Sequence, residues 1–356
     1  MAFLNQLEPD ALLAHFDQSP PLGFKTLRTK DGIPAFVAPF DLLTTADNAL
    51  RERVRALPLY RLWSGLLRPL TCFVGTTVSE YAMFPGSAEP EALAQELRST
   101  VARQYPLVVV KDIPEESPLL GAAESAWSSR FIEAATQAGF VMVEGQALAW
   151  VPIDFASADE YLGRLSSSRR KNLRRKLRSR DDLDVEVIPT GKAFADPERV
   201  AAFYALYRQV YEQSDIHFDL LDLEFFRRAL QDEDGGGVVM VYRHQGTLVG
   251  WNLCYVHEGR LLDKYIGFSY PLAREHNLYF VSWMYNLEYA RAQGLTHYVA
   301  GWTDPEVKAS LGARFHMTRH AVYIRNPLLR FVLRRMTKHF ESDRQWQEEY
   351  EASRRT

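Results

Sequence analysis

The second half of the chain alternates between apolar strand-like runs and longer segments with helical spacing. A helix is expected over 197–213, because Phe203, Leu206, Tyr207 and Val210 recur on one helical face. Three β-prone runs follow, separated by glycine-containing turns that favour tight hairpins, so they predict an antiparallel meander. These runs cover 238–243, 248–257 and 261–268. Further helices over 278–293 and 305–311 and further strands over 296–300 and 317–325 complete the pattern.

The first half has a weaker pattern of the same kind. The Asp31–Gly32 turn lies between two β-prone segments, which is a hairpin signal. Apolar β-branched runs and helical periodicities then alternate along the chain. The expected strands cover 70–78, 107–110, 140–144 and 147–153, and the expected helices cover 89–103 and 125–138. This half therefore predicts a mixed α/β unit as well.

Two basic segments interrupt this pattern. Between Arg169 and Arg180, eight of twelve residues are basic, and leucines at helical spacing predict two helical pieces over 157–182. The tail over 326–350 has the pattern of a basic amphipathic helix, with Leu329, Val332 and Phe340 on its apolar side. Such a helix is suited to contact with a membrane or a partner, although packing on its own domain is the more common outcome.

Composition narrows the class of protein. A chain of 356 residues exceeds one ordinary core, so about two domains are expected. The net charge of −3 argues against wholesale wrapping of nucleic acid. Neither a secretory signal pattern nor a run of roughly 18 apolar residues is found, so a cytoplasmic location is expected. Cys72 and Cys254 are expected to be buried structural thiols, and the nine histidines have no recognised metal spacing.

The order of elements in the second half resembles the GNAT superfamily of N-acyltransferases, and especially its Fem-type branch. The residues that carry this resemblance are the runs VVMVYRHQGTLVGWNLCYVHEGRLLDKYIGFSY, NLYFVSWMYNLEYARAQG, THYVAGW and DPEVKASLGARF, with SSSRRKNLRRKLRSR before them. Fem-type proteins contain two GNAT-like units in tandem. The resemblance therefore implies an α/β fold with a mixed sheet, a degenerate unit over 1–156, a basic linker helix over 157–182, an acyltransferase unit over 183–325 and a C-terminal amphipathic helix over 326–356.

The resemblance also implies acyl-CoA as the co-substrate, with no metal. GNAT enzymes hold the pyrophosphate of coenzyme A at a glycine-rich turn before a helix, but residues 271–278 contain no glycine here. The free N–H groups of a helix start still favour an anion. The cofactor-binding residues expected at this turn are Arg274, His276, Asn277 and Leu278.

Direct acyl transfer needs a base for the amine and a positive group for the oxyanion. Asp263 is the expected base, on a strand whose alternation places it on one face with Tyr265; a structural ion pair with Lys264 or an arginine is the alternative. Lys308 is the expected oxyanion group, four residues before the glycine that ends a short helix; a solvated surface lysine is the alternative.

Four further residues are expected to bind substrate: Asn252, Tyr265, Trp302 and His217. Asn252 and Trp251 must face opposite sides of their strand, and Trp302 follows a strand at an edge where ligands bind in this fold. Asp304 is expected to cap the short helix, with Pro305 at its first position.

The pattern leaves three functions open. The first is an N-acyltransferase that uses acyl-CoA and acts on an amine of a small metabolite or of a cell-envelope or natural-product precursor. The second is a Fem-type transferase that takes its aminoacyl group from tRNA, with Arg169 to Arg180 as the tRNA contact. The third is a non-catalytic binding module. A solvated linker helix is the plainest interpretation of the basic run.

Overall fold

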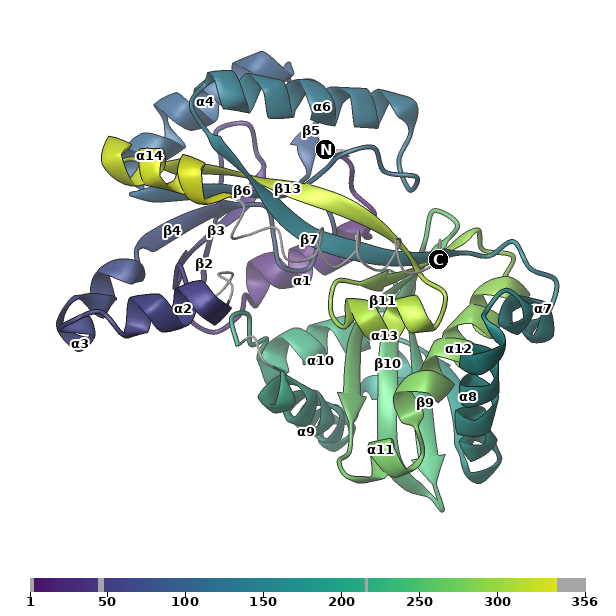
Figure 1. Ribbon diagram of the computed structural model, residues 1–356. Coiled ribbons are helices and arrows are strands. Elements are labelled where there is room, and N and C mark those ends of the chain that lie inside the picture. The colour runs from purple at the N-terminus through teal and green to yellow at the C-terminus, as the bar shows by residue number, and fades with distance from the viewer. Residues whose placement is uncertain (1–2, 44–47, 215–216, 338–356) are drawn as a thin grey trace. The chain divides into compact units, whose positions relative to one another are not determined.

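The computed structural model describes residues 3–43, 48–214 and 217–337, which form two compact units (Figure 1). Unit 1 contains Met1–Gln6, Gly23–Ala147 and His316–Thr356, and unit 2 contains Leu7–Leu22 and Leu148–Phe315. Strands β7 (Val141–Pro152) and β13 (Arg314–Ile324) each contribute residues to both units.

Unit 2 contains the antiparallel meander expected from the sequence. Strands β9 (Gly237–His244), β10 (Thr247–His257) and β11 (Arg260–Phe268) are antiparallel neighbours in that order. Strand β8 (Asp184–Pro189), which was not predicted, pairs with β9 in antiparallel orientation. Strand β12 (His297–Gly301) lies parallel to β11, and its other neighbour is the end of β7, in antiparallel orientation. The sheet is therefore mixed, as predicted.

Helices cover both faces of the unit 2 sheet (Figure 1). On one face Trp251 of β10 packs against Phe203 of α9 (Pro197–Gln213) and Phe226 of α10 (Leu223–Gln231). On the other face, α12 (Leu278–Ala292) packs over the sheet, with Tyr285 against Tyr242. Helices α7 (Ala158–Gly163) and α8 (Ser167–Leu177) join the α12 side through a shared apolar core. Short helices α11 (Leu272–Glu275) and α13 (Pro305–Ser310) flank α12 in sequence, and 3-10 turns occur at Arg178–Asp182 and Lys192–Phe194.

The N-terminal helix α1 (Asp10–Gln18) belongs to unit 2, although it comes first in the sequence. It is held there by polar contacts as well as by packing on α10. His15 Nε2 lies 2.9 Å from Asp232 Oδ2. Just before the helix, the buried Glu8 carboxylate lies 3.2 Å from the Lys264 ammonium of β11. Sequence periodicity does not predict this docking, because each contact joins residues more than 200 positions apart.

Unit 1 shares with unit 2 an antiparallel meander that is followed by helices and by a strand parallel to the last meander strand, but no helix follows its first strand. Strands β2 (Lys25–Arg28), β3 (Pro34–Pro39) and β4 (Leu70–Val74) form an antiparallel meander, and the hairpin predicted at Asp31–Gly32 is confirmed. Strand β6 (Leu107–Pro114) lies parallel to β4, and β13 pairs with β6 in antiparallel orientation. Helices α4 (Pro90–Ser99), α5 (Val101–Gln104) and α6 (Ala122–Gln137) pack on this sheet.

Several boundaries differ from the sequence expectation. The strand expected over 70–78 ends at Val74, because Gly75 adopts a φ of +124° and the chain turns away. The two strands expected over 140–153 form the single strand β7. Segments without a clear periodicity were missed: β1 (Phe3–Leu4), β5 (Phe84–Pro85), α2 (Asn48–Arg55), α3 (Tyr60–Trp63) and a 3-10 turn at Ser64–Leu67. Cys72 and Cys254 are free and buried, as expected.

The tail forms helix α14 (Pro327–Met336), capped by the Asn326 side chain. The more common outcome, in which its apolar face packs on its own domain, is wrong for Leu329 and Val332, because both side chains are exposed. Phe340 lies outside the described residues.

Candidate functional site

The candidate site lies where the two parallel strands of unit 2 part. Strands β11 and β12 pair only from Arg260 to Leu262, opposite His297 to Val299. Beyond that point β11 continues to Phe268 with β10 as its neighbour, while β12 ends at Gly301 with a φ of +76°. Asp263 is therefore the first residue of β11 past the last parallel pair. A strand edge without a partner leaves backbone N–H and C=O groups for a ligand.

A β-bulge in β11 sets the direction of the side chains at this point. Leu253 lies opposite Tyr265, whereas the next residue of β10, Cys254, lies opposite Asp263, so Lys264 is the extra residue. The bulge interrupts simple alternation, and the prediction that Asp263 and Tyr265 share one face is wrong. The ring of Tyr265 instead packs among aromatic rings of α9 and α10, those of Tyr207, Phe225 and Phe226.

Asp263 lies in a polar network on the α12 side of the sheet. Its Oδ2 accepts hydrogen bonds from Tyr298 at 2.8 Å and from Asn286 at 2.9 Å. Asn252 Nδ2 lies 3.3 Å from both carboxylate oxygens, and the Cys254 thiol lies 3.7 Å from Oδ1. Burial raises the pKa of Asp263, and these donors oppose part of that rise. The carboxylate is thus oriented by four donors and more basic than an ordinary aspartate.

The alternative role for Asp263, an ion pair with Lys264, is wrong. Lys264 is 6% exposed at its side chain and pairs with Glu8, which is fully buried. The partner of the lysine is therefore on the N-terminal segment, and Asp263 is left with neutral hydrogen-bond donors. Trp251 and Asn252 do face opposite sides, as predicted, because Trp251 Nε1 donates to the Phe203 carbonyl of α9.

Two amide oxygens beside Asp263 are buried acceptors. The Oδ1 atoms of Asn252 and Asn286 have no hydrogen-bond partner among the described residues. Asn252 is 1% exposed and Asn286 is fully buried. A buried polar atom without a partner costs free energy, so these oxygens are suited to receive an N–H or O–H donor of a bound molecule.

Lys308 is buried, so the alternative of a solvated surface lysine is wrong. Its side chain lies on α13 with only 5% of its surface exposed, and Nζ donates to the Ala300 carbonyl at 2.7 Å. Ala300 is near the end of β12, where the strands part. The charge of Lys308 lowers the pKa of Asp263, so the two groups act on one another electrostatically. Pro305 opens α13 as predicted, but Asp304 has a φ of 55° and makes no side-chain cap.

Tyr279 was missed by the sequence analysis. It lies in the first turn of α12, and its hydroxyl is buried without a partner among the described residues. Burial raises its pKa, and the negative charges of Asp304 and Asp263 raise it further. The phenol therefore keeps its proton at neutral pH. A signal existed in the sequence, since Tyr279 and Asn286 are seven positions apart and share a helix face.

The turn before α12 differs from a phosphate-binding loop. Arg274 contacts Gln213 at 2.6 Å and stacks on Tyr270, while the His276 ring lies 4.2 Å from that of His244. Asn277 Nδ2 donates to Ser179 at 3.2 Å, and Leu278 is fully buried. The backbone N–H groups of residues 277, 280 and 281 already bond to the carbonyls of Arg274 and Asn277. The predicted cofactor residues lie together, but most of their donors are engaged.

The other two predicted substrate residues lie at the periphery. Trp302 is half-buried and directly follows Gly301, at the end of β12. His217 is exposed after α9, with its ring edge-on to Tyr211 at 5.0 Å. Within the described residues, no contact joins His217 to Asp263 or Lys308.

The basic run forms α8 and the turn after it, and it packs in unit 2. Leu173 is buried, and the Lys176 ammonium lies 3.2 Å from the centre of the Phe280 ring on α12. Burial lowers the pKa of Lys176. Arg180 makes a bidentate pair with Glu288 at 2.7–2.8 Å. The solvated linker is therefore wrong for the inner side of this helix, while its outer arginines remain exposed.

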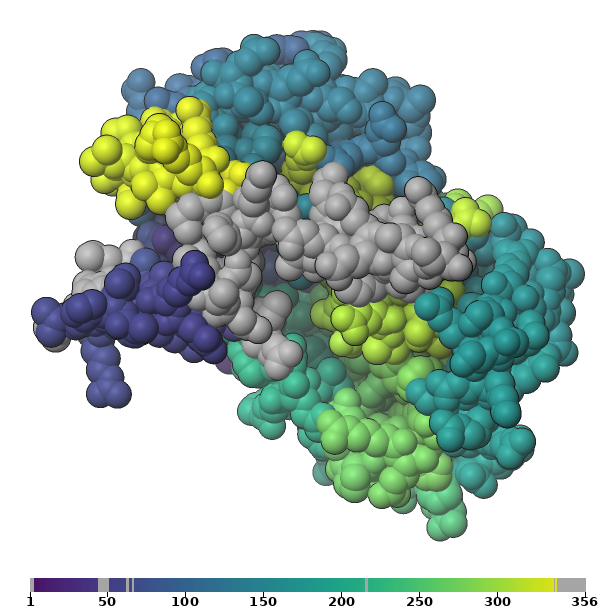
Figure 2. All heavy atoms as spheres, viewed as in Figure 1, coloured from purple at the N-terminus to yellow at the C-terminus, as the bar shows by residue number. Residues whose placement is uncertain are grey.

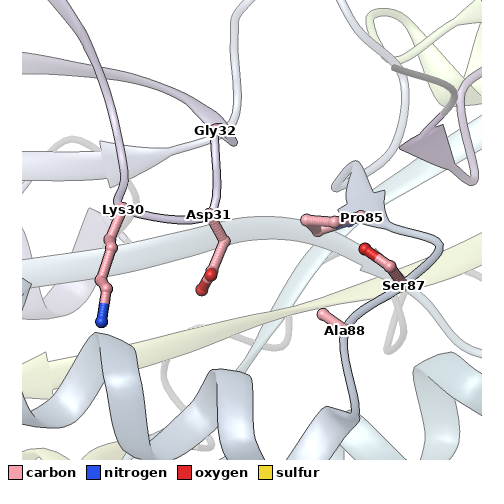
Figure 3. A pocket seen from close by; sticks show the side chains of 6 residues that line it. All are labelled: Lys30, Asp31, Gly32, Pro85, Ser87 and Ala88. Carbon is pink, nitrogen blue, oxygen red and sulfur yellow. The ribbon is translucent and has the colours of Figure 1, made fainter.

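A separate hollow of about 430 Å³ lies in unit 1, beside the β2–β3 turn (Figure 3). It is lined by Lys30, Asp31, Gly32, Pro85, Ser87 and Ala88. None of the predicted site residues lies there, and turn residues with one exposed lysine offer little chemistry. In the part of the chain that the structure describes, no three His, Cys, Asp or Glu side chains are grouped to hold a metal. Over the same residues, no helix has the length and apolarity to span a membrane.

Comparison with known proteins agrees with this geometry. Residues 167–309 match the family model described as the acetyltransferase (GNAT) domain. No curated protein matches the chain.

Three solved structures share the fold over nearly the whole chain. The C-terminal domain of a putative lysylphosphatidylglycerol synthetase from Agrobacterium fabrum is 12% identical, with a TM-score of 0.54 over 91% of this chain and 93% of that one. L-PGS from Bacillus licheniformis is 10% identical, with a TM-score of 0.53 over 96% and 99%. FemX is 14% identical, with a TM-score of 0.52 over 90% and 97%. The chain therefore has a GNAT/Fem-like fold, and its residues 167–309 match the model of the GNAT domain.

Proposed function

We propose that the chain is an N-acyltransferase that moves an acyl group from acyl-CoA to an amine, at the point where β11 and β12 part. The observation that carries the proposal is the arrangement of Asp263 and Lys308. Asp263 is partly exposed, has a raised pKa and is held by four donors, while the buried Lys308 ammonium lies within electrostatic reach.

In this mechanism the acceptor amine attacks the thioester carbonyl directly. The Asp263 carboxylate takes the proton that the amine loses as the C–N bond forms. The oxyanion is stabilised by the positive charge of Lys308 and by backbone groups along the edge of β11 past Leu262. The protonated phenol of Tyr279 is placed to donate to the departing thiolate as the C–S bond breaks.

The substrate-binding roles follow from the same geometry. The buried Oδ1 atoms of Asn252 and Asn286 accept N–H donors and so orient an acceptor amine beside Asp263. Trp302 forms a wall beyond the end of β12. Tyr265 keeps only an indirect role, because its ring packs between β11 and helices α9 and α10 and thereby supports the bulge. His217, Arg274 and His276 are proposed as outer contacts with substrate.

A second candidate function is transfer of an aminoacyl group from tRNA. The observation that favours it is the turn before α12, where backbone and side-chain donors are already engaged in bonds within the chain. The exposed arginines of α8 would then contact the nucleic-acid backbone. A non-catalytic binding module is the third candidate function, and the same turn is the observation that favours it. Unit 1 is proposed as a degenerate repeat that lacks the catalytic pair.

Calorimetric titration with acetyl-CoA and longer acyl-CoAs tests the donor. Micromolar binding that survives Arg175→Glu/Arg178→Glu on α8 supports the acyl-CoA enzyme. If acyl-CoAs do not bind but aminoacyl-tRNA does, and the α8 variant loses that binding, the tRNA-dependent function replaces it. If neither donor binds, the chain is a non-catalytic module. Asp263→Asn serves as the matched variant, because it should retain donor binding and lose turnover.

A further inference from the structure

Helix α14 exposes apolar side chains that an isolated soluble unit would bury. Leu328 is 74% exposed, Leu329 55%, Phe331 54% and Val332 47%. The helix is anchored on its other side, where Arg330 stacks on Tyr323 at 4.5 Å and donates to the Ile324 carbonyl at 2.9 Å. Figure 2 shows α14 in yellow at the surface. Its apolar side is therefore fixed in place facing outward.

A second segment of unit 1 also combines arginines with exposed apolar side chains. Between Arg51 and Arg61 the chain contains four arginines and one glutamate. It also presents two leucines to solvent, Leu57 at 51% and Leu59 at 71% exposure. Shortly afterwards, Leu70 at the start of β4 is 50% exposed.

The pairing of strands places both segments at one end of the unit 1 sheet. The 51–61 segment leads into β4, where Thr71 lies opposite Leu107 of β6. Leu107 in turn lies opposite Ile324, the last residue of β13, from which α14 begins. Neighbouring strands are about 4.8 Å apart, so Thr71 and Ile324 are separated by roughly 10 Å. Both segments thus connect to the same end of the unit 1 sheet.

Charge identifies the kind of surface that would cover them. Helix α14 has three arginines and no acidic residue, so the two segments together have a formal charge of +6. The chain as a whole has −3, which leaves −9 for the remainder. Arginines alone would suit nucleic acid, but exposed leucines and a phenylalanine gain nothing from a phosphate backbone. Apolar side chains flanked by arginines are the pattern of helices that lie in the interface of an anionic bilayer.

We infer that α14 and the 51–61 segment together form a docking surface for a membrane rich in anionic phospholipid. The inference does not depend on the acyl donor or acceptor. The apolar side chains insert among the acyl chains near the headgroups, and the arginines contact lipid phosphates. Docking of this kind is peripheral and reversible, and it would confine the protein to a bilayer surface.

Sedimentation of the full chain with vesicles tests the inference. We expect binding to phosphatidylcholine vesicles that contain 30% phosphatidylglycerol, and at least tenfold weaker binding to pure phosphatidylcholine, since each arginine near an anionic surface contributes about 1 kcal/mol. Leu328→Glu/Phe331→Glu and, separately, Leu57→Glu/Leu59→Glu should each reduce binding by at least tenfold, because buried apolar area is lost. These side chains are exposed, so circular dichroism should show an unchanged fold.

The matched control is Arg175→Glu/Arg178→Glu on α8 in unit 2, which should bind vesicles like the parent. No binding to anionic vesicles overturns the inference. So does binding that the α8 variant loses and the α14 variant keeps. Binding of the parent to RNA instead of vesicles, insensitive to Leu328→Glu/Phe331→Glu, would assign the surface to nucleic acid. A dimer in light scattering that Phe331→Glu dissociates, without vesicle binding, would assign it to a second copy.

Discussion

Units 1 and 2 both have a meander followed by helices and a parallel strand, yet their parallel strand pairs end differently. In unit 2, β11 and β12 part after Leu262 and Val299, and the next residue of β11, Asp263, remains partly exposed. In unit 1, β4 and β6 part after Val74 and Val110. The next residues of β6, the strand that corresponds to β12, are Lys111 and Asp112.

The opening in unit 1 is closed by the chain itself. Lys111 Nζ donates to the Thr76 carbonyl at 2.9 Å and pairs with the adjacent Asp112 carboxylate. The backbone N–H of Ala82 donates to the Asp112 carbonyl at 2.8 Å, so the segment after β4 is bonded to the end of β6. Asp112 is 3% exposed. In both units the fold creates an open strand edge where the two parallel strands part. Local side chains determine whether a substrate can reach that edge.

The largest expected effect is on the carboxylate of unit 2. Asp263→Asn should lower kcat by about 10³-fold or more, because the amine loses its base, and general bases contribute up to about 10⁴-fold. Donor binding measured by calorimetry should persist. A control change at the end of the parallel pair in unit 1, Asp112→Asn, should leave kcat of the folded protein within a factor of about two.

Turnover of Asp263→Asn equal to the parent would remove Asp263 from the mechanism. If Asp263→Asn and Asp112→Asn lower kcat equally, the two units do not differ as proposed. Steady-state rates with the same acyl donor and amine, corrected for folded protein by circular dichroism, give the comparison.

The second effect concerns buried and exposed ion pairs. Glu8→Gln should lower the free energy of unfolding by about 3–5 kcal/mol, because it removes the buried carboxylate that pairs with the buried Lys264 ammonium. Glu115→Gln in unit 1 removes a pair with Arg319 in which both side chains are partly exposed, and should cost below about 1 kcal/mol.

Urea unfolding at pH 7 measures both values. Glu8→Gln/Lys264→Met should recover part of the loss, since no isolated buried charge then remains. If Glu8→Gln costs no more than Glu115→Gln, the N-terminal segment is not held on unit 2 by this pair.

The sequence predicts the fold of unit 2 better than its site. The meander, α12 and the parallel strand follow from glycine turns and regular periodicity. The bulge at Lys264 does not, because it depends on the register between β10 and β11, and it places Asp263 and Tyr265 on opposite faces. Contacts between distant parts of the chain, such as Glu8 with Lys264, carry no local signal at all.

Residue type and spacing identified the candidate base and lysine, but not their surroundings. Asp263 was assigned from its strand, while Tyr298 and Asn286, which donate to it, became visible only once β12 and α12 packed on β11. Burial of Lys308 likewise depends on how α13 folds back on the end of β12. The catalytic roles of these residues stay predictions.

A third effect sharpens the role of Lys308. Lys308→Met should lower kcat by about 10²-fold, the loss typical of one oxyanion donor. Because the charge of Lys308 lowers the pKa of Asp263, its removal should raise that pKa and move the acid limb of the kcat/KM profile to higher pH. Lys111→Met in unit 1 should change neither quantity. An unshifted profile with normal turnover would make Lys308 a structural residue only.

The smallest effect is a difference in acid sensitivity that arises in unit 1. Burial lowers the pKa of His316 to about 4, while an unfolded histidine titrates near 6.5. As pH falls below 6.5 the unfolded chain gains a proton that the folded one does not, so stability is lost down to about pH 4. His316→Gln should remove about 1 kcal/mol of the loss between pH 7 and 5.5, measured by urea unfolding at both values. The partly buried His320, whose pKa is also lowered, keeps part of the pH dependence of stability. His217→Gln at the exposed site in unit 2 is the matched control. If His316→Gln leaves the pH dependence of the free energy of unfolding unchanged, His316 is not held neutral in the folded protein. In that case the contact between its ring and the Tyr81 hydroxyl at 3.1 Å opens on protonation.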